Sequence, residues 1–517
     1  MKTKNNQPSW LNNAVFYEVY PQSFKDSNAD GIGDINGITE KLGYIRELGC
    51  NAVWINPCFK SPFGDAGYDV EDYYTVAPRY GTNDDLIRLF EEAHKLDMHV
   101  ILDLVPGHTA ITHPWFKKSM LAERNEFTDR YVWTDSIWEE PQGMGCIRGI
   151  SDRDGSCAVN FFSHQPALNY GFYRPDPNKK WQQSMNAEGP LATREALKDI
   201  MRFWLNAGCD GFRVDMAGSL VKNDEDGKGT IALWQDIRKF LDKEFPNAAM
   251  VSEWGEPDKA LIGGFHMDFL LHFGPSHYND LFRCDDPYFS KKGLGNAKDF
   301  VAAYKNSYEK SGCKGLICIP SGNHDMDRIS RRLDNDELKT AFAFLLSMPG
   351  APFIYYGDEI GMKYVEGLTS VEGGYGRTGS RSPMQWNKDV NAGFSEAPKS
   401  QLYIRQDESD DRPDAESQSA DENSLRSEIK RLISLRMSNP ALQSNEKIEF
   451  ISDGYPLVYK RSSDNQEITV VINPSSAESK VTGVRGKIIY KVGNNASISG
   501  DALLVGGCTA VFVENEI

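Results

Sequence analysis

The sequence lacks the features of membrane, disulfide-rich and nucleic-acid-binding proteins. No apolar run reaches the roughly 18 residues that a membrane-spanning helix needs. The first 20 residues contain no apolar segment of a secretory signal, which favours a cytoplasmic location. The nine cysteines are scattered without CxxC or Cys/His ligand spacing, which favours a reducing compartment over a disulfide framework. The net charge of −17 argues against nucleic acids and anionic membranes as partners.

The chain instead alternates short apolar runs with segments of helical periodicity. The runs expected to be strands are 14–21, 51–57, 99–106, 209–216, 248–254, 314–325 and 351–359. The run 99–106 is almost continuously apolar, as in a parallel strand that is buried on both faces. Repeated strand–helix units predict a parallel sheet with right-handed crossovers, and their number, near eight, favours a closed (β/α)₈ barrel of the α/β class.

Two segments interrupt this alternation and predict the domain organisation. Residues 110–180 have no helical period and are too long for a simple loop, so we expect an inserted domain after the third strand. Residues 439–517 contain short β-type runs separated by Gly, Asn and Ser, which predict a C-terminal antiparallel β-sandwich. The barrel then comprises residues 1–109 and 181–438. The acidic stretch 406–424 is typical of a disordered linker.

Acidic residues stand at or near the ends of four predicted strands: Asp103, Asp215, Glu253 and Asp325. Taken alone, each acid is most simply interpreted as a helix cap or an ion-pair partner. In a parallel barrel, however, these strand ends meet at one rim, where active sites form. Cleavage of a glycosidic bond with retention needs one carboxylate as the nucleophile and another carboxyl as the acid. We expect Arg213, two residues before Asp215 on the same strand face, to keep the nucleophile ionised by depressing its pKa.

Residues 26–34, DSNADGIGD, place oxygen ligands at alternate positions. Asp26, Asn28, Asp30, the Ile32 carbonyl and Asp34 match positions 1, 3, 5, 7 and 9 of a calcium-binding loop. The alternative is a turn rich in Asx hydrogen bonds that needs no ion.

Several motifs are distributed along almost the whole chain: AVFYEVYPQSFKDSNADGIGDINGI, GYDVEDY (67–73), DLVPGHT (103–109), GFRVD (211–215), the Glu253 segment, NHD (323–325) and RSPMQW (381–386). Together they resemble the motifs of glycoside hydrolase family 13, the α-amylase family, and most of all its oligo-1,6-glucosidase and α-glucosidase branch. The resemblance implies a barrel with an inserted domain B and a C-terminal β-sandwich. It also implies a structural calcium ion at the 26–34 loop. The choice between calcium and magnesium at this loop is open.

The resemblance also implies roles for individual residues. Asp215 is the expected nucleophile, Glu253 the acid/base and Asp325 the residue that stabilises the transition state. The expected contacts of the sugar at the cleavage point are Tyr68, His108, Arg213 and His324. Asp69 and Arg381 are the expected pair that holds the non-reducing end in exo-acting members.

Three positions depart from the family pattern, and one of them is in the domain B motif QPALNY (165–170), which lacks the Asp of the usual QPDLN. Gly107 stands where the family usually has Asn. Met216 follows the nucleophile, where branches that prefer α-1,6 bonds often have Val and α-1,4 branches often have Thr or Ala. The linkage preference is therefore open.

The favoured interpretation is an exo-acting α-glucosidase for short oligosaccharides, with a monomer as the expected state. A sucrose isomerase or trehalose synthase would share every catalytic residue. A non-catalytic relative of the amino-acid-transporter heavy-chain type would need lost acids and a membrane span, and the sequence has neither feature. A pure carbohydrate-binding module would not need three aligned acids.

Overall fold

Eight parallel strands form the centre of the molecule. The computed structural model describes residues 7–141, 143–312, 314–373 and 376–516. The strands are β1 (Phe16–Val19), β2 (Ala52–Ile55), β5 (His99–Leu104), β8 (Gly211–Val214), β9 (Ala249–Ser252), β10 (Met267–Phe269), β11 (Leu316–Cys318) and β12 (Phe353–Tyr355). Their order is β11-β10-β9-β8-β5-β2-β1-β12, and a parallel bridge between Pro320 and Phe353 joins the two ends. The (β/α)₈ barrel expected from the sequence is confirmed.

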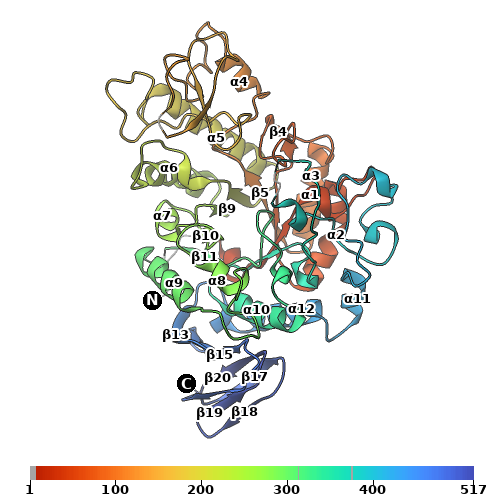
Figure 1. The fold of residues 1–517 in the computed structure, drawn as a ribbon. Helices are drawn as coiled ribbons and strands as arrows, with labels where there is room; N and C mark the ends of the chain where they lie inside the picture. Colours follow the sequence, from red (N-terminus) through yellow and green to blue (C-terminus); the bar gives the residue numbers. More distant parts are fainter. Residues whose placement is uncertain (1–6, 142, 313, 374–375, 517) are drawn as a thin grey trace.

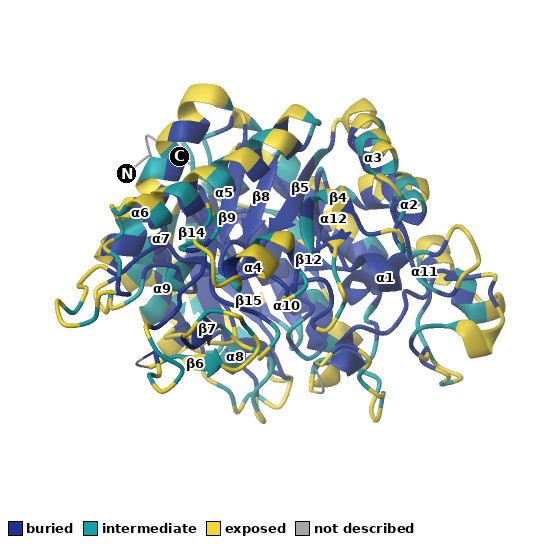
Figure 2. Cartoon of the chain, turned by 90° about the horizontal axis from the view of Figure 1, so that it is seen from above, coloured by how far each residue is buried: buried dark blue, intermediate teal, exposed yellow. Residues whose placement is uncertain are grey.

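The strands are buried on all sides because helices cover the barrel. Figure 2 shows dark-blue strands β5, β8 and β9 behind helices whose outer faces are exposed. The principal covering helices are α2 (Ile35–Leu48), α3 (Asn83–Lys95), α5 (Glu188–Asn206), α6 (Lys228–Glu244), α7 (Pro257–Ile262), α9 (Lys298–Lys310), α10 (Asn335–Ser347) and α12 (Leu425–Ser438). Local chemistry sets their ends: Thr82 and Asp85 form a capping box at α3, and Gly49, at φ 109°, ends α2.

Between β5 and α5 the chain leaves the barrel and forms a separate lobe, drawn in orange and yellow in Figure 1. It contains α4 (Pro114–Ser119) and the hairpin of β6 (Gly145–Ile147) and β7 (Cys157–Val159). The lobe has a small apolar core of its own, formed by Val132, Ala158, Ala167, Phe172 and Trp181. A bridge between His108 and Ala167 ties it to the barrel rim, so side chains of the lobe reach the ends of the strands.

The C-terminal part forms two antiparallel sheets, drawn in blue in Figure 1. One sheet has the order β13-β14-β15-β20-β17 and the other β16-β19-β18. Their bounds are β13 (Lys447–Asp453), β14 (Leu457–Ser462), β15 (Glu467–Asn473), β16 (Ser479–Thr482), β17 (Lys487–Val492), β18 (Ala496–Ser499), β19 (Ala502–Val505) and β20 (Thr509–Glu514). This agrees with the predicted C-terminal β-domain.

The expectation of a disordered linker over 406–424 is wrong. Residues Ala415–Ala420 form helix α11, because the Asp414 side chain accepts a hydrogen bond of 2.7 Å from the Ser417 backbone N–H and caps the first turn. Gln418 then donates to the Ile360 carbonyl at 2.7 Å, which ties the segment to the 3-10 turn Asp358–Ile360 after β12. Among the described residues, no helix is long and apolar enough to cross a membrane.

Candidate active site

A cavity of about 610 Å³ opens at the carboxyl ends of the barrel strands. Its lining residues come from the barrel rim, the inserted lobe and the loop that follows β12. They are Asp65, Tyr68, His108, Phe161, Phe162, Asp215, Met216, Gly218, Ser219, Glu253, Trp254, Glu256, His272, Phe273, Asp325 and Arg377. The three predicted catalytic acids therefore face one space.

Arg213 holds the floor of this cavity together. Its Nη1 lies 2.9 Å from Oδ1 of Asp103 and 2.9 Å from Oδ1 of Asp215, and its Nη2 lies 2.8 Å from Oε2 of Glu253. Strand register explains why these side chains lie together. Asp103 of β5 pairs with Arg213 of β8, and Glu253 directly follows the neighbouring β9. All four side chains are at most 10% exposed, so one buried cation faces three acids.

Burial dominates the ionisation of these acids. It raises the pKa of Glu253 to about 8; Arg213 opposes the rise, whereas Asp215 and Asp325 add to it. The pKa of Asp215 is also raised, to about 7, because burial outweighs the opposing charge of Arg213. Arg213 lowers the pKa of Asp215, as expected, but burial outweighs it, so the total shift is upward instead of the expected downward one. The order of the two values still leaves Glu253 as the group that holds its proton longer.

Asp325 lies in the opposite electrostatic environment. Arg381 Nη2 lies 2.9 Å from its Oδ1, Arg377 Nη1 contacts the same oxygen, and His324 Nε2 is 3.3 Å from its Oδ2. Burial opposes its ionisation, but His324, Arg377 and Arg381 outweigh burial and hold the pKa of Asp325 well below its usual range. This carboxylate stays charged beside a neutral Glu253.

The predicted sugar contacts divide into two groups. Tyr68 and His108 line the cavity, whereas Arg213 and His324 lie beneath its surface and are only 1% and 0% exposed. His108 is oriented by the Tyr68 carbonyl at 3.1 Å, and burial lowers its pKa to about 4, so its ring is neutral.

Gly107 leaves room for the side chain of Asn160 beside His108. A Cβ at Gly107 would lie 2.8 Å from Nδ2 of Asn160, which also lies 3.1 Å from His108 Nδ1. A larger residue at position 107 would displace Asn160, so glycine there accommodates the amide beside His108.

The structure does not bring Asp69 and Arg381 together. Asp69 is 0% exposed and accepts hydrogen bonds from Ser61 Oγ and from the backbone N–H groups of Gly64 and Asp65 at 2.8–3.1 Å. Its carboxylate shapes the 61–65 turn, and neither Asp69 nor Arg381 is among the residues that line the cavity. Their expected role in holding a terminal sugar stays a prediction.

The acid–arginine pair that lines the cavity is Asp65 and Arg377. Arg377 Nη2 lies 3.3 Å from Asp65 Oδ1, and Gln165 of the inserted lobe donates to Asp65 Oδ2 at 2.7 Å. Sequence reasoning missed both residues. The available signals were their short distances from the GYDVEDY and RSPMQW motifs, three residues before Tyr68 and four before Arg381.

The predicted calcium loop is closed by its own hydrogen bonds. Both oxygens of Asp26 accept from the loop backbone or from Ser395, and both oxygens of Asp34 accept from Ser27 or from the first turn of α2. Asn28 and Asp30 each accept from the backbone two residues ahead. The donor chemistry suits a hard cation, but the three carboxylates do not converge on one point as they are arranged. Calcium binding stays a prediction and would require these side chains to turn.

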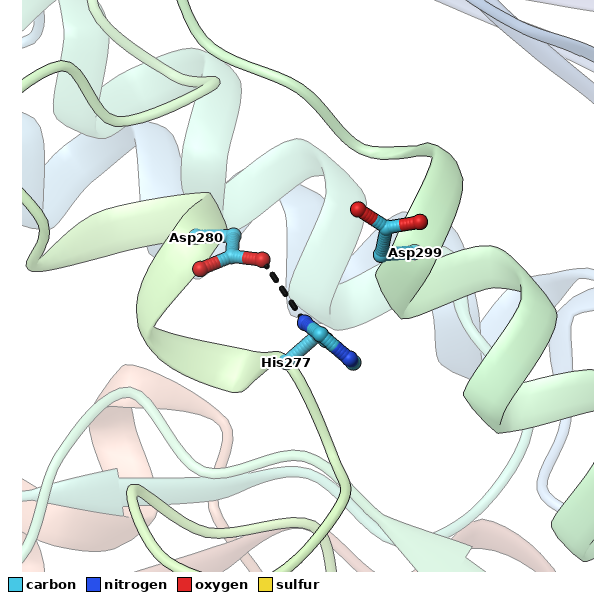
Figure 3. Close-up of side chains that lie close together, drawn as sticks. All are labelled: His277, Asp280 and Asp299. Carbon is cyan, nitrogen blue, oxygen red and sulfur yellow. Dashed lines mark hydrogen bonds and ion pairs between the residues drawn. The ribbon is translucent and has the colours of Figure 1, made fainter.

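Within the described part of the chain, one group of three His or acidic side chains has ligand atoms within 4.8 Å of one another: His277, Asp280 and Asp299 (Figure 3). This group does not line the cavity. His277 and Asp280 form a 3.0 Å ion pair at the start of the five-residue helix α8 (Tyr278–Phe282). This exposed helix-start contact accounts for the grouping without a ligand.

Comparisons with known proteins agree on the family. Residues 18–445 match the family described as the α-amylase catalytic domain. The chain is 32% identical over 459 residues to the trehalose synthase/amylase TreS of Mycolicibacterium smegmatis, covering 78% of this chain and 71% of that protein. It is 31% identical over 536 residues to a probable α-glucosidase of Rhizobium meliloti, covering 90% and 89%. A solved α-glucosyl transfer enzyme, XgtA, superposes with a TM-score of 0.81 at 25% identity, covering 99% and 100%.

The pKa order predicts a bell-shaped pH dependence of kcat/KM. Activity should rise as Asp215 loses its proton near pH 7 and fall as Glu253 loses its proton near pH 8, because the nucleophile must be charged and the acid protonated. Glu253→Gln should lower the rate by about 10²–10⁴-fold and remove the falling limb. The exposed Glu244→Gln on α6 is the control, and an unchanged falling limb in Glu253→Gln would contradict the assignment.

If the 26–34 loop binds calcium, EDTA should lower the melting temperature by a few degrees, because an ion bound only to the folded state stabilises it by mass action. Calorimetry with and without EDTA measures this, and Asp30→Ala should abolish the difference. An unchanged melting curve together with no metal by elemental analysis would mean that the loop is held by its hydrogen bonds alone.

Proposed function

The chain belongs to the α-amylase family, and from that premise we propose that it is a retaining, exo-acting α-glucosidase that releases glucose from the non-reducing end of short α-1,4- or α-1,6-linked oligosaccharides. The observation that carries this proposal is the Arg213 cluster. One guanidinium contacts both Asp215 and Glu253, which places the two carboxyl groups side by side. Close carboxyl groups are what retention requires, because inverting enzymes leave room for a water molecule between them.

The charges suit the two steps of such a reaction. An oxygen of Asp215 forms a bond to the anomeric carbon while the glycosidic C–O bond breaks, and the Glu253 proton passes to the leaving oxygen. A water molecule then gives a proton to Glu253, and the water oxygen forms the new bond to the anomeric carbon while the bond from this carbon to Asp215 breaks. The ionised Asp325 stabilises the positive charge that develops on the sugar in both steps.

The shape of the cavity supports attack at a chain end. Beside Asp325 the Asp65–Arg377 pair lines the cavity, and two loops approach each other nearby, since a Cβ at Gly373 would lie 3.0 Å from the Gly64 carbonyl oxygen and 3.7 Å from Phe162. The sequence also suggested that the loop 361–380 adds to the wall on this side, and residues 374–375 of that loop lie outside the described residues. A carboxylate and a guanidinium can bind the hydroxyls of a terminal sugar with directional, charge-assisted hydrogen bonds. We assign to Asp65 and Arg377 the role that the sequence suggested for Asp69 and Arg381.

A glucosyl-transferring or isomerising activity is the second candidate. Four large apolar side chains also line the cavity, namely Met216, Trp254, Phe161 and Phe273, and the last two are exposed by 59% and 38%. An apolar wall favours retention of the released sugar over entry of water, so the released sugar could attack the glucosyl-enzyme in place of water. The similarity to proteins named trehalose synthase supports this candidate too.

Product analysis on maltose, isomaltose, sucrose, trehalose and soluble starch tests both candidates, with Asp215→Ala as the inactive blank. The proposal expects glucose as the first product with the α-configuration, and starch as a poor substrate. A rearranged disaccharide without net glucose would favour isomerisation. Rapid loss of starch viscosity with long products would contradict exo action.

The Asp65–Arg377 pair has its own test. Arg377→Ala should lower kcat/KM on disaccharides by about tenfold to a hundredfold, since it removes one charge-assisted contact to the sugar and one to Asp325. Arg332→Ala is the matched control, because Arg332 is an exposed arginine paired with Asp285 at 3.2 Å. Equal activity of the two variants would show that the pair does not bind substrate.

A further inference from the structure

A fully buried acid that the proposed reaction does not use lies under the cavity floor. Glu18 belongs to β1, is 0% exposed and does not line the cavity. Its Oε1 lies 2.9 Å from Nδ1 of His324, which is also 0% exposed. His324 immediately precedes Asp325, so Glu18 acts on the site through this ring.

The neighbours of His324 determine which nitrogen carries the hydrogen. Nε2 lies 3.3 Å from Oδ2 of Asp325, an ionised carboxylate that can only accept a hydrogen bond. Nε2 also lies 2.7 Å from the Tyr68 hydroxyl, whose own hydrogen can go to Asp103 Oδ2 at 3.0 Å. A hydrogen on Nε2 is thus matched by acceptors on that side of the ring.

The other ring nitrogen faces a donor. The amide nitrogen Nδ2 of Asn56 lies 3.1 Å from Nδ1, and an amide N–H₂ can only donate. Nδ1 then presents a lone pair. Ionised Glu18 would place a lone pair against this one at 2.9 Å and repel it, whereas a protonated carboxyl donates to it and shares the single lone pair with the amide N–H in a three-centre hydrogen bond.

We propose that Glu18 is a positioning residue: it stays protonated, donates its carboxyl hydrogen to His324 Nδ1 and so holds His324 as the neutral tautomer that donates from Nε2 toward Asp325. This role rests on the proposed function, in which Asp325 stabilises the reacting sugar. The surroundings agree, because burial raises the pKa of Glu18 well above its usual range. Arg213 and hydrogen bonds from Asn56 and the His324 backbone oppose this rise, and Asp103 adds to it. Burial likewise lowers the pKa of His324 well below its usual range.

Two substitutions separate this role from simple packing. Glu18→Gln keeps an N–H that can donate to Nδ1, so kcat should stay within about threefold of the wild type. Glu18→Leu has similar bulk but no donor, so His324 loses its orientation and kcat should fall by about tenfold to a hundredfold, with KM changing less. Release of 4-nitrophenol from its α-glucoside measures both constants, and thermal unfolding shows whether each variant is folded.

Glu359→Gln and Glu359→Leu are the matched controls. Glu359 is also a 0% exposed glutamate, but it accepts from the Tyr17 and Tyr44 hydroxyls at 2.8 and 2.7 Å and does not line the cavity. These variants should alter the melting temperature without altering kcat. A Glu18→Gln variant that is folded yet as slow as Glu18→Leu would overturn the proposal, as would a Glu18→Leu variant with the wild-type kcat.

An infrared measurement tests the proton directly and does not depend on turnover. The wild-type-minus-Glu18→Gln difference spectrum in D₂O should contain the C=O stretching band of a protonated carboxyl. A carboxylate band in its place would overturn the proposal even if Glu18→Leu failed to fold. If no α-glucoside is turned over, the proposed function fails, and the infrared band still decides the state of Glu18.

Discussion

The contact of one buried guanidinium with three carboxyl groups is the constraint on which the rest of the site depends. Arg213 carries a single positive charge, whereas Asp103, Asp215 and Glu253 together can carry three negative charges in a place that water hardly reaches. Desolvation makes full ionisation costly, and one cation cannot compensate for it. The cluster therefore retains protons near neutral pH, and Glu253, which also faces the charge of Asp325, retains its proton longest.

A second cluster, around Asp325 in the same cavity, has the opposite balance of charge. Asp325 contacts two guanidiniums, and its carboxylate stays ionised. Two acidic residues of one cavity are thus held in different states by their surroundings, as their proposed roles of acid catalyst and stabilising anion require. The proposed tautomer of His324 fits this charge balance. Its Nε2–H faces Asp325, and because the ring is neutral it does not add a third full positive charge beside that carboxylate.

The fold makes both clusters possible by bringing distant segments to one rim. Glu18 and Asp325 are more than three hundred positions apart in the chain, yet both act on the ring of His324. The inserted lobe contributes Gln165 and Asn160, which orient Asp65 and His108. The lobe therefore positions residues of the barrel rim in addition to covering the cavity.

Much of this was predictable because it depends on local patterns. Apolar runs between amphipathic helices predicted the barrel, and strand-end acids together with family motifs led to Asp215, Glu253 and Asp325, which the structure places in one cavity. The three-residue strand β10 escaped prediction, since so short a run has no periodicity of its own and is defined by pairing with β9 and β11. The 406–424 segment was misjudged because composition does not reveal that Asp414 caps a helix.

The sequence by itself determined the fold class, the family and the acids that a barrel of this kind presents at its rim, since these follow from residue periodicity and from short motifs. Only the tertiary structure decided which partners those acids have. It paired Arg377 with Asp65, left Asp69 to shape a turn, raised the Asp215 pKa by burial against the pull of Arg213, and set Glu18 beneath His324. Ion pairing and pKa depend on distances and on exclusion of water, and those quantities exist only once the chain has folded.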